Sequence, residues 1–302
     1  MLDEYLIGKH LRDSPECQVP IINFVESNYR AGGAANVALN LKALDLNPIL
    51  LSAVGQDLEA TILKNLLTRA KINSTWLQFE SRPTTLKQRV VNEEYKQFLR
   101  IDRETDHDLD HSMEQKFLTR FRDLLSTQTI DGLILQDYNK GLLTAQVIQA
   151  IQVEAYSKKI PLFVDPKGDN FLALSHCTLF KPNIKELSFI LGKTIAPKVD
   201  SIHAALKELE LQSEIICVTL GDKGIYFEKP KTQEIGLVEV EAISNADVSG
   251  AGDSVIATLV WAYFEGFSIQ EMLEYANRAG KYVCSKAGIT IVNKSMLLKA
   301  DN

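Results

Sequence analysis

The 302-residue chain is predicted to be an α/β protein with a mostly parallel central sheet, helices on both faces of that sheet, and a small additional sheet. Three observations support this prediction. The composition, 45% hydrophobic and 24% charged, is typical of a globular protein with a large core. Short, almost wholly apolar runs alternate with amphipathic segments. Other stretches alternate apolar and polar residues one by one.

Four apolar runs have the length and the β-branched content of strands buried on both faces. They are residues 47–54, 130–136, 160–165 and 214–220. Six segments have the apolar spacing of helices, and the apolar run 255–264 is also expected to be helical. The six are residues 34–44, 58–70, 112–125, 144–157, 184–191 and 201–211. Because strand and helix alternate, the connections predict parallel strands.

The small sheet is predicted from residues 19–26, 84–92 and 95–103, which alternate apolar and polar side chains like half-exposed antiparallel strands. A short turn at Asn92-Glu93-Glu94 joins the last two. We expect this sheet to form a lid, inserted from about residues 10–28 and 82–103. Since no Pro-, Gly- or Ser-rich linker divides the chain, residues 1–302 are expected to form a single domain.

Charge and targeting signals narrow the possible partners and compartment. With 33 Lys+Arg against 39 Asp+Glu, the net charge is −6, and no basic patch is visible that would favour nucleic acid. No apolar stretch is long enough for a membrane helix, and Met1 is not followed by a signal-peptide pattern. The four cysteines are widely spaced and are expected to be reduced, so a cytoplasmic protein is predicted.

The strongest motif is Asp247-Val-Ser-Gly250-Ala251-Gly252-Asp253-Ser254, which precedes the apolar run 255–264. Small residues let a ligand approach the backbone, and a helix beginning here would direct N–H groups and its positive dipole end at an anion. Asp253 beside a bound phosphate would be suited to accept a proton from an attacking hydroxyl. For an isolated motif, a tight turn with Asp253 as helix cap would be the simpler interpretation.

Two further motifs have a phosphate-binding character. Thr219-Leu-Gly221-Asp222-Lys223-Gly224 follows the strand predicted at 214–220, and its glycines could present amides to a phosphate or form a hairpin turn. Asn183-Ile-Lys-Glu186 opens a helix, either as an ordinary capping box or as a polar pair that holds a Mg²⁺-bound phosphate through water.

Together with Arg30-Ala-Gly32-Gly33-Ala-Ala-Asn36-Val-Ala, these ordered motifs resemble the PfkB, or ribokinase-like, sugar kinases from Met1 to about residue 290. Within that family the chain resembles most the kinases that phosphorylate C1 of D-glycero-D-manno-heptose 7-phosphate in lipopolysaccharide heptose biosynthesis. The subgroup likeness involves the segments 1–5, 14–20, 99–104, 137–141 and 165–168. Some members of that subgroup are bifunctional, and this chain is expected to lack their nucleotidyltransferase half.

The resemblance implies a ribokinase-like three-layer fold and ATP-dependent phosphoryl transfer to a sugar hydroxyl. Asp253 would be the general base, and the backbone of Gly250, Ala251 and Gly252 would stabilise charge on the transferred group, as phosphoryl transfer requires. On the nucleotide side, the resemblance implies ATP and Mg²⁺ binding by Asn183 and Glu186, nucleotide contacts from Thr219, Gly221 and Gly224, an adenine contact from Asn277, and a possible K⁺ site at Asp247.

On the sugar side, Gly32 and Gly33 would let the backbone approach hydroxyls, while Asn36 and Asp3 would hydrogen-bond to them. The GGAANVA segment could otherwise simply begin a helix packed closely on a strand. A substrate that already carries a phosphate would need basic residues, and we expect two or three among the following six. The candidates are Lys87, Arg89, Arg100, Arg103, Lys140 and Lys167.

Two alternatives remain open at this stage. The chain could be a kinase for another sugar or nucleoside, such as fructose 1-phosphate or ribose, or a catalytically silent binding protein on the same fold. The lid is expected to close over the sugar and to form a homodimer contact, as in the resembling family. In those kinases an apolar strand precedes the segment that begins here at Met1, so a longer natural N-terminus or a missing inner strand is also expected.

Overall fold

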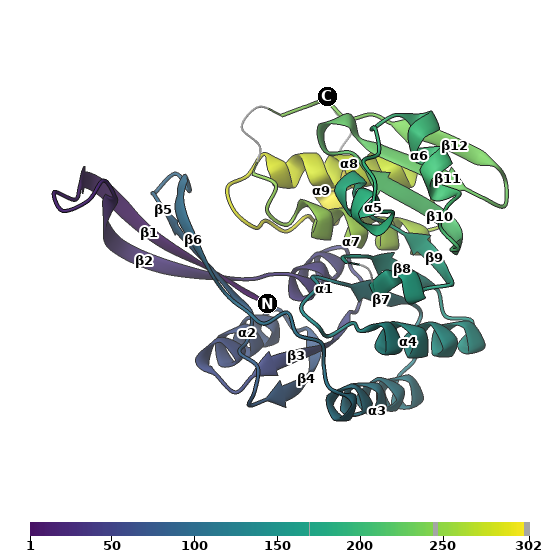
Figure 1. Ribbon diagram of the computed structural model, residues 1–302, viewed down its shortest axis with the longest axis horizontal. Helices are drawn as coiled ribbons and strands as arrows, with labels where there is room; N and C mark the ends of the chain where they lie inside the picture. The colour runs from purple at the N-terminus through teal and green to yellow at the C-terminus, as the bar shows by residue number, and fades with distance from the viewer. Residues whose placement is uncertain (169, 244–246, 299–302) are drawn as a thin grey trace. The chain divides into compact units, whose positions relative to one another are not determined.

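The computed structural model describes residues 1–168, 170–243 and 247–298 (Figure 1). It divides into two compact units. Unit 1 comprises Met1–Thr105, Ala246–Ser254 and Tyr282–Lys294, and unit 2 comprises Asp106–Asn245, Val255–Lys281 and Ser295–Asn302. Helices α7 (Ala251–Phe264) and α8 (Ile269–Cys284) each contribute residues to both units.

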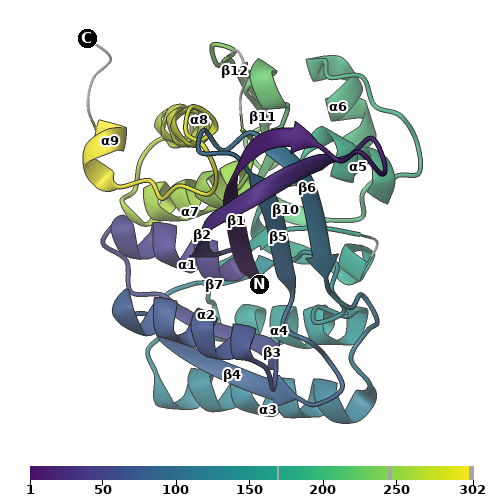
Figure 2. The same ribbon diagram turned by 90° about the vertical axis from the view of Figure 1, so that its left-hand side faces the viewer.

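A four-stranded sheet in the order β2-β1-β5-β6 dominates unit 1 and forms the long curved ribbon of Figures 1 and 2. Its strands are β1 (Leu2–Asp13), β2 (Pro20–Ala31), β5 (Leu86–Val91) and β6 (Gln97–Arg103). The β1–β2 and β5–β6 pairs are antiparallel, whereas β1 and β5 run parallel. The β5–β6 turn forms at Asn92, whose side chain accepts the Glu94 and Lys96 N–H groups.

Strand β1 was not predicted from the sequence. Nearly all residues in the first half of β1 are buried, including Asp3 and Glu4. The alternation of apolar and polar residues that marks a half-exposed strand is therefore missing. These carboxylates are buried because they have partners on β5: Arg89 pairs with Asp3, and the Gln88 amide donates to Glu4 (2.7 Å). These partners lie 84 or more positions away in the sequence, so a pattern of neighbouring residues cannot predict the burial of Asp3 and Glu4.

Unit 1 also contains helices α1 (Ala34–Ala43) and α2 (Leu58–Arg69) and a parallel pair of strands, β3 (Ile49–Gly55) and β4 (Asn73–Phe79). Apolar side chains from β1, α1, β3, α2 and β5 form one core, in which Leu2, Leu63 and Leu67 are fully buried. Asp57 caps α2 by accepting the Ala60 N–H (2.9 Å). The core therefore holds the start of α1 against the first residues of β1.

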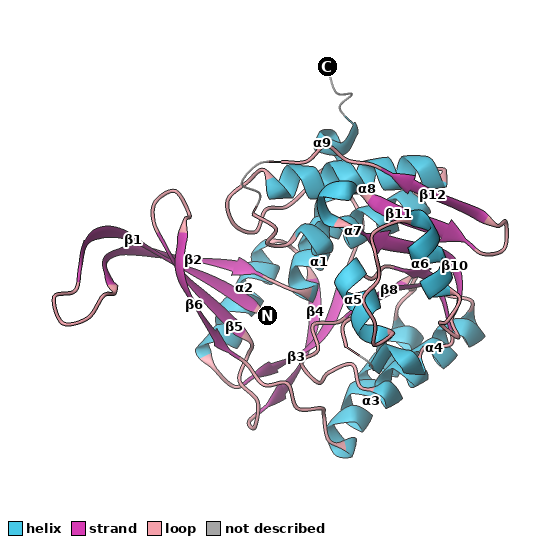
Figure 3. Cartoon of the chain, turned by 45° about the horizontal axis from the view of Figure 1, so that its top comes forward, coloured by secondary structure: helices cyan, strands magenta, loops and turns pink. Residues whose placement is uncertain are grey.

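Unit 2 contains a six-stranded sheet in the order β12-β11-β10-β9-β8-β7, with α7 and α8 on one face and α5 and α6 on the other (Figures 2 and 3). Strands β7 to β10 are parallel, and β11 and β12 are antiparallel additions. The strands are Leu133–Gln136, Leu162–Asp165, His176–Phe180, Gln212–Thr219, Ile225–Lys229 and Glu234–Val238. The remaining helices are α3 (His111–Thr127), α4 (Ala145–Lys158), α5 (Ile184–Ile190), α6 (Val199–Leu206) and α9 (Lys294–Leu298), with 3₁₀ turns at Asn170–Ala173 and Gly221–Lys223.

The predicted α/β class, the mostly parallel sheet and the smaller sheet are confirmed. Each predicted helix and strand has a counterpart whose ends differ by a few residues. No helix within the described ranges is long and apolar enough to span a membrane. The expectation of a single kinase domain with a lid from about 10–28 and 82–103 stays a prediction.

Candidate active site

Asp253 is the third residue of α7 and is almost completely buried, with 3% of its surface exposed. It therefore lies inside the first helical turn and is not the cap of that helix. Gly250, with φ +79°, forms the turn before the helix, and its carbonyl accepts the Ser254 N–H (3.0 Å). A Cβ added at Gly252 would meet nothing within 4 Å, so there is open space beside the helix start.

Asn36 contacts the Asp253 carboxylate directly. Its Nδ2 donates to Asp253 Oδ2 (2.8 Å), and the Asn36 side chain is fully buried. The Asn40 Nδ2 donates to Asn36 Oδ1 (3.2 Å), while Asn40 Oδ1 accepts the Val292 N–H (2.9 Å). Asn40 thus orients the Asn36 amide so that its N–H faces Asp253. Sequence reasoning missed Asn40, although its i,i+4 spacing from Asn36 was a visible signal.

Asp3 forms a buried ion pair with Arg89, and 2% of its surface is exposed. Burial raises the pKa of Asp3 above its ordinary value, against the lowering effect of the Arg89 charge. Burial lowers the pKa of Arg89, whereas the Asp3 charge raises it. The net result is a pKa of Arg89 above its ordinary value. A Cβ at Gly32 would lie 1.8 Å from Asp3 Oδ2, so the Asp3 carboxylate fits there only because residue 32 has no side chain.

Most of the other basic candidates for a substrate phosphate already pair with acids or aromatic rings. Lys87 meets Asp102 (3.0 Å) and Glu104 (3.4 Å), and Lys167 lies 5.8 Å from the centre of the Tyr138 ring. Lys140 follows β7 in unit 2. The structure therefore places Lys87 and Arg89 in unit 1 and Lys140 and Lys167 in unit 2. Arg100 and Arg103 pair with Asp102 (3.0 Å) and Glu59 (2.5 Å).

The nucleotide-binding candidates lie together in unit 2. Thr219 forms a bridge with Asn183, and its N–H donates to the Pro182 carbonyl (3.0 Å). The Val238 carbonyl accepts a bond from Asn277 Nδ2 (2.8 Å) and also faces Gly224. Asn183 and Glu186 form a complete capping box at the start of α5. The interpretation of this motif as a capping box is therefore confirmed. A contact of Asn183 and Glu186 with ATP stays a prediction.

The two glycines of the Thr219–Gly224 turn, Gly221 and Gly224, differ in the space around them. A Cβ at Gly224 would lie 2.1 Å from the Val238 carbonyl oxygen, at φ +91°, whereas Gly221 has φ +67° and open space. We expect Gly224→Ala to lower the free energy of unfolding by about 3 kcal/mol or more. Gly221→Ala is expected to lower it by only about 1–2 kcal/mol. Urea unfolding measures both, and equal losses would contradict this assignment.

Sequence reasoning also missed a polar group at the carboxyl ends of β7 to β9. Asp165 pairs with the buried Lys181 (2.9 Å) and accepts a bond from Gln136 Nε2 (3.0 Å). Asp137 Oδ2 and Gln136 Oε1 are buried and have no hydrogen-bond partner among the described residues. Burial raises the pKa of Glu186, and the nearby Asp165 charge adds to this effect.

These oxygens fit a hydrated Mg²⁺ ion. Within the described ranges, no three His, Cys, Asp or Glu side chains are arranged to bind a metal directly. Mg²⁺ usually keeps several waters and needs only one or two carboxylates, which Glu186 and the unpartnered oxygen of Asp137 can supply through water. The role of Glu186 at Mg²⁺ stays a prediction.

Burial raises the pKa of Asp137 to about 6, although backbone N–H bonds from Asn139 and Tyr138 oppose the shift. A folded pKa above the unfolded value of 3.8 means that the native state binds more protons than the unfolded state. The Asp137 carboxyl therefore lowers the free energy of unfolding of the protein as the pH rises from about 4 to about 6. We therefore expect Asp137→Asn to raise the free energy of unfolding at pH 8 by up to about 3 kcal/mol. Urea titrations at pH 8 and pH 5 test this, since the gain must shrink at pH 5; a variant no more stable at pH 8 would refute it.

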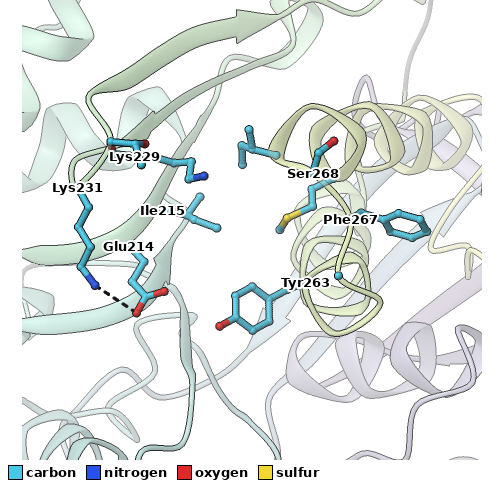
Figure 4. A pocket seen from close by; sticks show the side chains of 11 residues that line it. Glu214, Ile215, Lys229, Lys231, Tyr263, Phe267 and Ser268 are labelled. Atoms are coloured by element: carbon cyan, nitrogen blue, oxygen red, sulfur yellow. Dashed lines mark hydrogen bonds and ion pairs between the residues drawn. The ribbon is translucent and has the colours of Figure 1, made fainter.

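Figure 4 shows a separate pocket of about 360 Å³ within unit 2. Its wall combines Tyr263, Phe267 and Ile215 with the ion pair between Lys231 and Glu214 (3.7 Å). None of the site residues predicted from the sequence lines it. The two lysines of this pocket, Lys229 and Lys231, already pair with Glu234 and Glu214, so it has no evident anion-binding character.

The chain is similar to known proteins over nearly its full length. The model of the pfkB family of carbohydrate kinases matches residues 11–296 of this chain. The Bifunctional protein HldE of Pasteurella multocida is 35% identical over 294 residues, which cover 97% of this chain and 60% of that protein. The Helicobacter pylori protein of the same name is 36% identical over 299 residues, covering 96% of this chain and 62% of that protein. The chain thus spans about 60% of the length of these relatives.

Solved structures share its fold. Phosphofructokinase-2 from Escherichia coli in complex with potassium has a TM-score of 0.79 at 18% identity, covering 98% of this chain and 93% of that one. Arabidopsis thaliana ribokinase complexed with ribose and ATP has a TM-score of 0.71 at 18% identity, covering 98% and 94%. The predicted ribokinase-like fold is thereby confirmed.

Proposed function

This chain belongs to the pfkB family of carbohydrate kinases, and we propose that it transfers the γ-phosphate of ATP to the C1 hydroxyl of D-glycero-D-manno-heptose 7-phosphate. As a member of that family it is a phosphotransferase with an alcohol group as acceptor. The proposed mechanism rests on the buried Asp253 carboxylate, which lies in the first turn of α7 and accepts a hydrogen bond from Asn36.

In the proposed reaction, Asp253 accepts the proton of the attacking sugar hydroxyl. The hydroxyl oxygen forms a bond to the γ-phosphorus as the bond between that phosphorus and the β,γ-bridging oxygen breaks, which leaves ADP. The N–H groups at the start of α7 and the positive end of its dipole stabilise the negative charge of the transferred group. Asn36 holds the carboxylate in place through a hydrogen bond that does not require Asn36 to gain or lose a proton.

The nucleotide is proposed to bind the turn that contains Thr219, Gly221 and Gly224, with Asn277 near the adenine. Asn183 and Glu186 would hold Mg²⁺ through water, and that ion would neutralise charge on the phosphates. On the sugar side, the proposed contacts are Asp3, Gly32, Gly33 and Asn36. Candidate contacts for the existing phosphate of the substrate are Lys87, Arg89, Lys140 and Lys167.

The substrate assignment rests on the identity with the HldE proteins and on the segments that resemble heptose 7-phosphate kinases. It is tested by ADP release in a coupled assay with heptose 7-phosphate, fructose phosphates, ribose and adenosine. We expect the highest kcat/KM for heptose 7-phosphate. Activity only on an unphosphorylated sugar would overturn the substrate proposal. ATP or sugar binding without turnover would instead favour a silent binding protein.

The four-stranded sheet is proposed to be a lid that forms a homodimer. Its strands expose large apolar side chains, including Phe24 (65% exposed) on β2 and Leu99 and Ile101 on β6. We expect the double variant Leu99→Ser/Ile101→Ser to shift a dimer to monomer in light scattering after size exclusion. Leu172→Ser, an exposed apolar position in unit 2, is the control and should leave the dimer intact. A monomeric wild-type protein would contradict the proposal.

A cytoplasmic location belongs to the same proposal. The described structure contains four free cysteines, of which Cys177 and Cys217 are buried. Burial raises the pKa of both thiols to about 12, which keeps them protonated and unreactive. Such thiols are consistent with a reducing compartment.

A further inference from the structure

Arg30 connects several segments of unit 1. It lies near the end of β2, and its Nη1 donates to the backbone carbonyls of Ile289 (2.7 Å) and Ala287 (3.3 Å). Its Nη2 donates to the Tyr95 hydroxyl (3.0 Å). The guanidinium carbon also lies 4.9 Å from the centre of the Tyr5 ring and 5.2 Å from that of Tyr95. Its charge is therefore held by carbonyl oxygens and aromatic faces.

The loop that carries these two carbonyls is shaped around the guanidinium. Gly288, between them, has φ +70°, and a Cβ there would lie 2.7 Å from Arg30 Nη1 and 3.1 Å from the Tyr5 ring. The Gly288 N–H donates to Asp247 Oδ2 (2.7 Å), and the Ile289 N–H donates to the Tyr5 hydroxyl (3.2 Å). With its N–H groups bonded in this way, the loop directs both flanking carbonyls at one cation.

Carbonyl and carboxylate oxygens close together are also the donors that a monovalent metal ion prefers. A K⁺ ion was expected near Asp247, but these donors do not fit one. The carbonyls of residues 287 and 289 already accept bonds from Arg30. Both Asp247 oxygens accept backbone N–H groups, from Ser249 (3.0 Å) and Gly288. A metal ion here would have to share the two carbonyls with the Arg30 guanidinium and lie beside its tethered positive charge, which repels it.

We propose that the Arg30 guanidinium is a built-in cation that takes the place of a monovalent metal ion, so that the kinase works without K⁺. This inference rests on the proposed kinase function. Arg30 acts as a positioning residue through a short series of contacts. A Cβ at Gly250 would lie 3.6 Å from Ile289 and 2.9 Å from Asn36 Nδ2, the group that holds Asp253. The loop that Arg30 holds therefore packs beside the turn that begins α7.

The first test measures wild-type turnover in potassium, sodium and tetramethylammonium chloride at equal ionic strength. We expect kcat and KM to agree within about twofold among the three salts, a difference of less than about 0.5 kcal/mol. An increase of about tenfold or more that is specific to K⁺ would overturn the proposal. Turnover in none of the salts would instead count against the kinase function, so the two failures are distinguishable.

The second test uses Arg30→Met, which keeps much of the side-chain volume but removes the charge. We expect kcat to fall about tenfold to a hundredfold, since bonds from a charged donor are lost. Millimolar guanidinium or K⁺ should restore part of it. The control is Arg122→Met, which removes an exposed pair with Glu154 on unit 2 and should respond to neither cation.

A measurement that needs no substrate completes the test. The midpoint of thermal unfolding of Arg30→Met is expected to rise with KCl or low guanidinium relative to tetramethylammonium chloride, because a bound cation stabilises the folded state. The wild-type midpoint should not distinguish the three. Arg30→Lys, which restores a charge without the planar fork, serves if Arg30→Met does not fold, and should show a smaller version of the same response. Full wild-type turnover in Arg30→Met, or no response to either cation, would refute the proposal.

Discussion

Asp253→Asn is expected to lower kcat by about 10²- to 10⁴-fold, the range measured for loss of a general base. The amide has nearly the same shape as the carboxylate, so it can still accept the Asn36 N–H through its carbonyl oxygen. It cannot accept the proton of the sugar hydroxyl. The loss should therefore appear in turnover, measured as ADP release at saturating ATP and sugar.

Two measurements separate this loss from a folding defect. The Kd for ATP should stay within about threefold of the wild-type value, or about 0.7 kcal/mol. The thermal midpoint should change by less than about 4 °C. The matched control is Asp200→Asn, at an exposed carboxylate on α6, which should keep wild-type turnover. An Asp253→Asn enzyme with near-normal kcat would rule out Asp253 as the base.

Arg89→Met is expected to lower the free energy of unfolding by about 3–5 kcal/mol, because it leaves the Asp3 carboxylate buried without its partner. Urea unfolding at pH 7.5 measures the loss. Without Arg89 the pKa of Asp3 must rise further, since burial already raises it and the opposing charge is gone. The deficit should therefore shrink as the pH falls and the carboxyl takes up a proton.

The second substitution Asp3→Asn, made in the Arg89→Met background, should restore most of the lost stability, since it removes the unpaired charge. Arg122→Met is the control: its partner Glu154 is more accessible to water, and the loss should be about 1 kcal/mol or less. If Arg89→Met were as mild as Arg122→Met, the Asp3–Arg89 pair would not stabilise the four-stranded sheet as its burial indicates.

Patterns of neighbouring residues were sufficient for much of the fold. The run 255–264 and the motif before it predicted a helix beginning near Asp253, and α7 begins at Ala251. The Asn92 turn and the strands on either side were likewise predicted, because turn chemistry and alternation are local. In contrast, β1 was missed because its buried carboxylates look like surface residues until their partners on β5 are known.

The candidate site shows the same division. The chemistry of Asp253, of the glycine-rich turns and of the Asn183–Glu186 box follows from residue types at short spacing, and these were available in the sequence. The Asn36–Asp253 bond joins residues 217 positions apart, and the Arg30–Ile289 bond joins residues 259 positions apart. The unpartnered oxygen of Asp137 is likewise recognisable only when everything around it is placed.

The sequence by itself thus determined the family, the alternation of strands and helices and the residue proposed to accept the proton, because those depend on short-range periodicity and on motifs of a few residues. Tertiary structure alone decided which partner each buried charge has. A carboxylate or guanidinium leaves water only where specific hydrogen bonds replace its hydration, and here those bonds come from distant segments. For that reason the pairing of Asp3 with Arg89, and of Arg30 with two backbone carbonyls, could be read only from the folded chain.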